Sequence, residues 1–116
     1  MILLKKLALT TIILLGCLSN AYSTHYVGFD LSYACVGPNQ YEVTLNVMRD
    51  CQGVSVGSSQ FVEYSSTSCG VNASLTLTSV GVTDVTPLCS SEVSACGGGG
   101  SFGLERHVFK GILTLP

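Results

Sequence analysis

The sequence contains no tryptophan and few charged residues, and only five of its 116 residues are lysine or arginine. Two of these five, Lys5 and Lys6, lie near the N-terminus, which leaves Arg49, Arg106 and Lys110 for the rest of the chain. A nucleic-acid-binding protein needs a basic stripe that displaces counterions from phosphates. Peripheral binding to anionic lipids needs a basic cluster. The composition therefore excludes nucleic acid as a partner and argues against membrane-surface binding.

The sequence also lacks a convincing helix after residue 25, since no window there combines a 3.6-residue hydrophobic period with helix caps. Its polar residues are mostly Ser, Thr, Asn and Gly, and its apolar residues are mostly Val and Leu. That mixture suits the half-buried face of a pleated sheet better than a helix. We therefore expect an all-β protein.

The N-terminus has the order of a secretory signal peptide. The two lysines precede an apolar run over residues 7–18, and a small-residue zone, Ser-Asn-Ala-Tyr-Ser-Thr, follows at 19–24. The run is shorter than the roughly 20 residues that span a bilayer. We expect the export machinery to recognise residues 1–23 and cleavage to occur before Thr24 or before Tyr22. The mature chain is then expected to have no transmembrane span.

A second interpretation of this segment is a lipoprotein signal. Leu-Leu-Gly-Cys at residues 14–17 resembles a bacterial lipobox, in which Cys17 would be acylated and would anchor the protein in the outer membrane. The alternative is that Cys17 is one more apolar residue of the signal peptide. Both interpretations export the chain to a compartment where disulfides persist.

The clearest strand lies between residues 40 and 51, where Tyr41, Val43, Leu45 and Val47 alternate with polar residues. The preceding segment alternates too, and the turn-forming Gly-Pro-Asn between the two predicts an antiparallel hairpin. On that segment the predicted shared side carries Val27, Phe29, Leu31, Tyr33 and Cys35. Weaker strand patterns follow at 59–66, 73–80 and 105–116, with an irregular stretch at 81–104.

Short strands, turn signals and no helix predict an antiparallel, immunoglobulin-like β-sandwich that contains disulfides. Once residues 1–23 are removed, residues 24–116 are enough for one such module. The last strand pattern runs up to Pro116, which leaves few strands to close two sheets. We therefore expect the sandwich to be incomplete and this chain to be the N-terminal part of a longer protein.

Five cysteines remain after the signal peptide, and five cannot all pair within one chain. We expect one to stay free or to pair outside the chain, and we predict a bridge between Cys89 and Cys96, which flank a short polar segment. Zinc sites use cysteines two to four residues apart, and no pair here is that close, so we expect no metal or other cofactor. The disulfide candidates are Cys35, Cys51, Cys69, Cys89 and Cys96.

The remaining chemical motifs are weak. If cleavage placed His25 at a new N-terminus, His25 and His107 could bind copper together. Cleavage directly before His25 fits the signal-peptidase rule poorly, however. The glycines at 97–100 resemble a phosphate loop without the lysine and helix that such a loop needs, and we interpret them as a flexible connection. The acids that an enzyme could use are scattered singly along the sequence. They are Asp50, Glu63, Asp84 and Glu105.

Four segments of the chain resemble the opening of large secreted cell-surface proteins of the Bacteroidetes, of the gliding-motility-associated, adhesin-like group. In order, these segments are HYVGFDLSYACVGPNQYEVTLNVMRDCQG, SSTSCGVNASLTLTS, TDVTPLCSSEVSACGGG and HVFKGILTLP. The resemblance covers about residues 24 to 116. It implies a non-enzymatic module that is followed by more of its own β-domain, by immunoglobulin-like or PKD-like repeats, and by a C-terminal type IX secretion sorting domain.

The sequence thus predicts a secreted or cell-surface module with a structural or adhesive role, whose ligand would be a surface glycan or a protein. One alternative is a carbohydrate-binding accessory module, because such modules hold sugar rings on exposed aromatic side chains. The absence of tryptophan weakens this alternative. A second alternative is a small lipoprotein that is anchored through Cys17. The aromatic candidates for sugar binding are Tyr26, Tyr33, Tyr41 and Tyr64.

Overall fold

The computed structural model describes residue 1, residues 5–6, residues 25–100 and residues 102–116. The predicted cleavage sites and the lipidation alternative at Cys17 lie outside the described residues. Within the described residues, no helix has both the length and the apolar character needed to cross a membrane.

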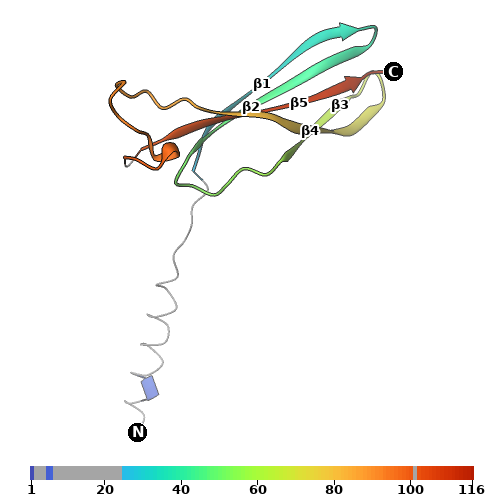
Figure 1. The fold of residues 1–116 in the computed structure, drawn as a ribbon. Coiled ribbons are helices and arrows are strands. Elements are labelled where there is room, and N and C mark those ends of the chain that lie inside the picture. The colour runs from blue at the N-terminus through green and yellow to red at the C-terminus, as the bar shows by residue number, and fades with distance from the viewer. Residues whose placement is uncertain (2–4, 7–24, 101) are drawn as a thin grey trace.

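Five antiparallel strands form one sheet in the order β1-β2-β5-β4-β3 (Figure 1). The last strand in sequence therefore lies at the centre of the sheet, between β2 and β4, and β1 and β3 form its two edges. A short 3₁₀ helix, η1 (Ala95–Gly97), lies in the loop before β5. The strands are β1 (Tyr26–Gly37), β2 (Gln40–Asp50), β3 (Ser59–Ser66), β4 (Val71–Asp84) and β5 (Leu104–Thr114).

The predicted hairpin between the first two strands is confirmed. β1 pairs with β2 from Tyr26 opposite Arg49 to Gly37 opposite Gln40, which leaves Pro38 and Asn39 as the turn. Asn39 has a φ of 55°, a left-handed conformation that asparagine tolerates better than most residues. The strand predictions at 59–66 and 73–80 are also confirmed.

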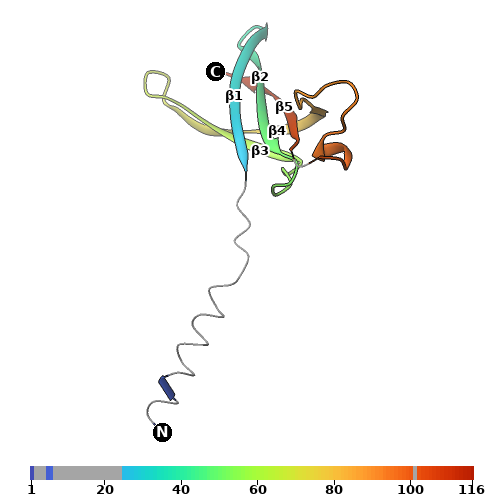
Figure 2. The ribbon, with the colours of Figure 1, turned by 90° about the vertical axis from the view of Figure 1, so that its left-hand side faces the viewer.

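The all-β antiparallel prediction is confirmed, but the predicted two-sheet sandwich is not seen among the described residues, which form one curled sheet. Figure 2 shows β1 and β2 crossing the direction of β3 and β4, as expected for a strongly twisted sheet. Period-2 alternation reports only which side chains share a face. It does not report whether the opposite layer is a second sheet or a curled part of the same one.

The inner face of the curled sheet carries a small core of four buried hydrophobic residues, which are Val43, Val47, Leu77 and Phe109. Leu77 and Phe109 are fully buried, and Leu45 packs against the cluster from a half-buried position. The predicted inward orientation of β2 is thus confirmed for its two valines. All four core residues lie on β2, β5 and β4, the three central strands of the curled sheet.

Register shifts in β1 and β4 change the predicted strand boundaries and faces. In β1 the register shifts between Tyr26 and Gly28, so Tyr26 stands opposite Arg49 and Val27 leaves the side that Phe29 and Leu31 share. In β4 a second shift lies between Ser79 and Gly81, and the strand continues to Asp84. The prediction of irregular structure from residue 81 is therefore wrong for the last residues of β4.

The prediction that the module contains a disulfide is confirmed, but the predicted Cys89–Cys96 pairing is wrong, because Cys96 is bonded to Cys51. The bridge ties the loop that holds η1 to the end of β2, and the backbone N–H of Cys51 also donates to the carbonyl of Gly103. The sequence-based pairing relied on proximity along the chain. The fold instead brings together two cysteines 45 residues apart.

Candidate functional site

The described part of the chain has an open groove on its inner face, between the two edge strands. The groove has two adjoining parts of about 530 Å³ and 420 Å³, and both are lined by Leu31 of β1 and Val62 of β3. We call this hollow the inner groove. Its lining is Tyr26, Gly28, Phe29, Leu31, Ser32, Tyr33, Tyr41, Val43, Leu45, Val47, Gln60, Phe61, Val62, Glu63, Tyr64, Leu113 and Leu115.

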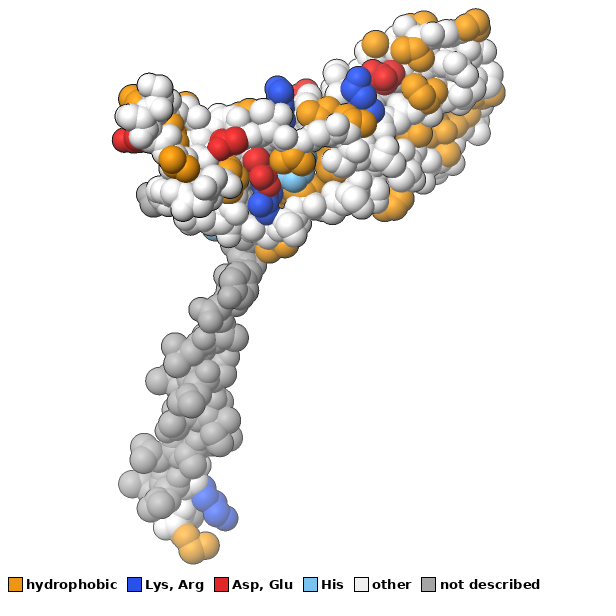
Figure 3. All heavy atoms as spheres, in the orientation of Figure 1, with side chains coloured by type: hydrophobic (Ala, Val, Ile, Leu, Met, Phe, Trp, Pro, Cys, Tyr) orange, Lys and Arg blue, Asp and Glu red, His pale blue; other side chains and the backbone are white. Residues whose placement is uncertain are grey.

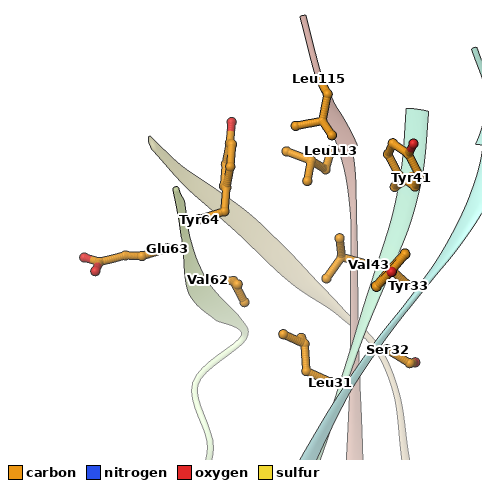
Figure 4. A pocket seen from close by; sticks show the side chains of 10 residues that line it. All are labelled: Leu31, Ser32, Tyr33, Tyr41, Val43, Val62, Glu63, Tyr64, Leu113 and Leu115. Carbon is orange, nitrogen blue, oxygen red and sulfur yellow. The ribbon is translucent and has the colours of Figure 1, made fainter. Parts of the chain in front are cut away.

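The strand alternation explains why this lining is apolar. Tyr41 of β2 stands opposite Leu113 of β5, and Leu31 and Tyr33 of β1 stand opposite Leu45 and Val43 of β2, so these side chains share one face. Figure 4 shows that Leu31, Tyr33, Tyr41 and Leu113 border a common space with Val62, from the opposite edge. The two polar residues in this view, Ser32 and Glu63, point away from it. The inner groove is thus a mainly apolar surface, to which Gln60 adds one polar side chain.

The β1 side of the inner groove is strongly exposed. Phe29 is 79% exposed and Tyr33 is 76% exposed, although both lie on the face that carries the core. Tyr26 and Leu31 are each about half exposed. On the face shown in Figure 3, hydrophobic side chains gather over the arm that holds the β1–β2 hairpin. A monomeric protein rarely leaves a contiguous apolar patch of this kind uncovered, and such patches mark interaction sites.

All four predicted aromatic candidates lie in the inner groove. Tyr26 lines one part, and Tyr33, Tyr41 and Tyr64 line the other. Tyr33 and Tyr41 pack edge to face, with ring centroids 6.0 Å apart and an interplanar angle of 75°. A sugar ring stacks on a flat aromatic face, and these two rings do not form one continuous flat platform.

A cluster of three polar side chains, Arg49, Glu105 and His107, lies on the inner face at the end opposite the β1–β2 turn. Arg49 Nε donates to Glu105 Oε1 at 2.5 Å, and His107 Nε2 lies 2.6 Å from the same oxygen. The three side chains are between 11% and 17% exposed. Partial burial opposes ionisation of Glu105, but the hydrogen bonds from His107 and Arg49 together outweigh it and lower the pKa of this carboxyl.

A second acid anchors the loop between β4 and β5. Ser94 Oγ donates to one oxygen of Asp84, and Thr86 donates to the other through its hydroxyl at 2.5 Å and its backbone N–H at 2.9 Å. The pKa of Asp84 is lowered, chiefly by the hydrogen bond from Ser94 and then by those from Thr86. Ser94 also caps η1 by accepting from the N–H of Gly97.

The structure thus brings two of the four predicted acids together and leaves the other two apart. Asp84 and Glu105 occupy paired positions on neighbouring strands, whereas Glu63 lies on edge strand β3 and Asp50 ends β2. A general acid that works near neutral pH needs a raised pKa, and both paired carboxyls have theirs lowered. The hydrogen bonds to these acids come from this chain: Ser94 and Thr86 bind Asp84, and Arg49 and His107 bind Glu105.

The metal hypotheses find little support in the geometry. The sulfurs of Cys51 and Cys96 and a carboxylate oxygen of Glu105 lie within 4.8 Å of one another. Both sulfurs are bonded to each other, and the guanidinium of Arg49 already occupies the carboxylate. Of the two histidines proposed for copper, His107 is held by Glu105 and is buried, whereas His25 is exposed ahead of β1.

Sequence reasoning missed the polar cluster, although a pattern for it was present. The alternation that places Val43 and Val47 inward continues to Arg49, and the alternation from Phe109 continues to His107 and Glu105. Extending both patterns by one or two steps would have placed these three side chains on one face.

The other three cysteines of the module are unpaired and exposed in the described residues. Cys35 lies on β1 at the rim of the inner face, Cys69 lies at the β3–β4 turn, and Cys89 lies in the loop before η1. The first of the glycines at 97–100 belongs to η1, which ends at Gly97 and is capped by Gly98. Gly98 and Gly100 have positive φ, and a Cβ on Gly99 would meet the carbonyl oxygen of Val93 at 2.5 Å.

Comparisons of this chain with protein-family models, with curated proteins and with solved structures find no match.

Proposed function

We propose that this chain is a non-enzymatic, exported module of a bacterial cell-surface protein, with a binding or structural role. The observation that carries the proposal is the open, apolar inner groove between two sheet edges that have no further strand partner among the described residues. An enzyme of this size would need convergent acid and base groups in such a hollow. The inner groove has none inside it, and the paired carboxyls of Asp84 and Glu105 are held by the chain's own hydrogen bonds.

Three features support export and a place at the cell surface. The N-terminal sequence has the order of a signal peptide. The Cys51–Cys96 bridge suits an oxidising compartment. The resemblance of residues 24 to 116 to the N-terminal module of gliding-motility-associated, adhesin-like Bacteroidetes proteins points to the same place.

We further propose that the curled sheet is one layer of a two-layer β-structure related to the immunoglobulin-like sandwich. In such a structure the inner face of the sheet would be covered by at least one further strand, which the described residues of this chain do not supply. The support for this step is the exposure of Phe29, Leu31 and Tyr33, which stand on the same face as the buried Val43. Burial of these side chains would enlarge a core that consists of four residues in the curled sheet.

A carbohydrate-binding module is the second candidate, because four tyrosines line the inner groove. The edge-to-face packing of Tyr33 and Tyr41 and the scarcity of polar side chains inside the groove argue against it. Sugar recognition needs directed hydrogen bonds to hydroxyl groups in addition to an aromatic face.

Expression of the full chain in an exporting bacterial host tests the proposal. We expect the product outside the cytoplasm, with Thr24 or Tyr22 at its N-terminus by mass spectrometry, and no turnover in a hydrolase screen. A diacylglyceryl group on Cys17 would instead identify a lipoprotein. Turnover of a glycoside, ester or peptide substrate that disappears in Glu105→Gln but not in Glu92→Gln would overturn the non-enzymatic proposal. Specific hits on a glycan array that require Tyr33 would favour the carbohydrate-binding alternative.

A further inference from the structure

We propose that the inner groove binds an extended segment of another polypeptide, which adds to the free edge of β1 as a sixth strand and places alternate apolar side chains in the groove. This inference rests on the proposed binding role of the groove and names its partner. The partner segment is defined by chemistry: it is extended, apolar at every second residue, and neutral or basic at the residues between.

The shape and the backbone of the site select a strand over other occupants. The inner groove is concave and runs between two strands, so it fits a narrow, rod-like partner. An amphipathic helix could fill such a groove with side chains, but it would leave the outward N–H and C=O groups of β1 unpaired. An added strand pairs these groups and fills the groove with every second side chain.

The exposed area on β1 is large enough to hold a partner. An aromatic side chain contributes about 150–250 Å² of surface, so Phe29 and Tyr33, at 79% and 76% exposed, leave about 300 Å² uncovered. Tyr26 and Leu31 add to this area. Each partner of a standard protein interface contributes about 800 Å², so the β1 side of the groove supplies a large share of what stable association needs.

The edge of β1 is a better docking site than the edge of β3. β1 runs for 12 residues and β3 for eight. The inward side chains of β3, such as Val62 and Tyr64, are half-buried, whereas Phe29 and Tyr33 of β1 are almost fully exposed. A strand added to β1 therefore buries more new apolar surface and forms a longer hydrogen-bond ladder.

The charge of the module complements a neutral or basic segment. Residues 25–116 contain seven acidic and three basic side chains, which is a net charge of −4 with histidine neutral. Two of the three bases are already paired, Arg49 with Glu105 and Lys110 with Glu42. The one charged residue that lines the inner groove is Glu63, whose exposed side chain points away from the groove, so attraction of a basic segment rests on the net charge of the module.

A second copy of this chain fits the groove less well. Two copies that met face to face would bring concave surfaces together and leave a void between them. Each copy would also bring the same negative charge to the contact, and like charges across an interface disfavour association. We therefore assign the groove to a segment of a different sequence.

Peptide binding to the full chain tests the assignment. The probe is a fluorescent peptide of the length of β1 in which Val and Thr alternate between terminal lysines. The control is its isomer with all Val first and all Thr after. We expect the alternating peptide to bind and the isomer to bind about tenfold more weakly, because only the former presents one apolar face as a strand. N-methylation of alternate backbone nitrogens on the edge-facing side should weaken binding by a similar factor.

Two matched variants locate the binding site. Phe29→Ser changes an exposed side chain of the inner groove, and Ile112→Ser changes a half-exposed side chain on the outer face of β5. We expect Phe29→Ser to weaken binding of the alternating peptide about tenfold and Ile112→Ser to leave it unchanged. Circular dichroism of both variants confirms that the sheet is retained.

The outcomes separate this inference from the proposed function. Equal binding of the two peptide isomers would indicate non-specific hydrophobic binding and would overturn the inference. Lack of peptide binding, with glycan hits that Phe29→Ser abolishes, would overturn the inference while the groove remained a binding site. Tight self-association that excludes the peptide and that Phe29→Ser dissolves would assign the groove to a second copy instead. Hydrolase activity that needs Glu105 would overturn the proposed function itself.

Discussion

Leu31 on β1 and Val62 on β3 come from the two opposite edges of the sheet, and each of them lines both parts of the inner groove. No strand lies between these edges in the described residues. The sheet therefore curls far enough to bring its edges around one hollow but not far enough to close. The small core and the exposed groove follow from this incomplete closure.

Truncation of the core side chains should destabilise the fold in proportion to their burial. Leu77→Ala removes a fully buried side chain and should lower the free energy of unfolding by about 2–5 kcal/mol. Leu45→Ala, at a half-buried position on the same face, should cost less. Thr44→Ala, on the opposite face of β2, should cost least. Urea denaturation of the three variants measures the series, and equal costs at Leu77 and Thr44 would contradict the assigned faces.

Gly111 is predicted to tolerate no side chain. A Cβ there would lie 2.7 Å from Leu77 Cδ2 and 2.9 Å from the carbonyl oxygen of Thr76. The clash with backbone cannot be relieved by a rotamer change, so Gly111→Ala should destabilise the protein by about 1–3 kcal/mol. Gly28→Ala is the matched control, because no atom lies within 4 Å of a Cβ at that position. A Gly111→Ala variant as stable as the control would show that the β4–β5 packing is looser than described.

The Cys51–Cys96 bridge should stabilise the chain by about 2–4 kcal/mol, because it restricts the unfolded state across a long loop. Cys51→Ser and Cys96→Ser should each lose this stability, and the double variant should lose no more than either one. Cys89→Ser, at an exposed and unpaired position, should be close to neutral. Non-reducing peptide mapping checks the pairing directly, and a Cys89–Cys96 peptide would contradict it.

Stability should fall with acid through the two hydrogen-bonded carboxyls. The folded pKa of Glu105 is lowered by the hydrogen bonds from His107 and Arg49, so its contribution is complete above the unfolded pKa of about 4.3. That contribution is lost as the pH falls through the folded pKa. Asp84, whose pKa is also lowered, acts in the same direction.

Thermal melts between pH 7 and pH 3 measure this dependence. In Glu105→Gln the fall of Tm below pH 4.5 should be shallower than in the parent chain. Glu92→Gln changes an exposed acid and serves as the control that should keep the parent slope. If Tm of the Glu105→Gln variant fell with pH as steeply as that of the parent chain, Glu105 would not contribute to the loss of stability in acid.

The sequence supports the elements of this fold better than their assembly. Alternation located the strands and placed Val43 and Val47 inward, and Gly-Pro-Asn located the first turn, because both signals are local. The position of β5 between β2 and β4 is a long-range pairing that no local pattern records. The bridge between Cys51 and Cys96 depends on that pairing. The same holds for the inner groove. Alternation predicts which side chains line it, but its openness depends on how far the sheet curls.

The central claim is that a partner strand adds to β1 in register, and Cys35 offers a direct test of it. Cys35 is exposed on β1 opposite Tyr41, at the rim of the inner face. Side chains directly opposite in neighbouring strands have Cβ atoms about 4.5–5.5 Å apart, close to the separation that a disulfide requires. Alternating peptides that carry one cysteine at successive positions can therefore be cross-linked to Cys35 with oxidised glutathione. Cys69→Ser and Cys89→Ser remove the competing thiols.

The measurement is the cross-linking yield at each peptide position, by mass spectrometry. The account predicts that the yield alternates along the peptide. It should be high at the position opposite Cys35 and at every second position from there, and low at the positions between. It predicts that Phe29→Ser lowers the yield and that Ile112→Ser does not. A uniform yield along the peptide, or no cross-linking to Cys35 at any position, would contradict the claim that the inner groove accepts a strand.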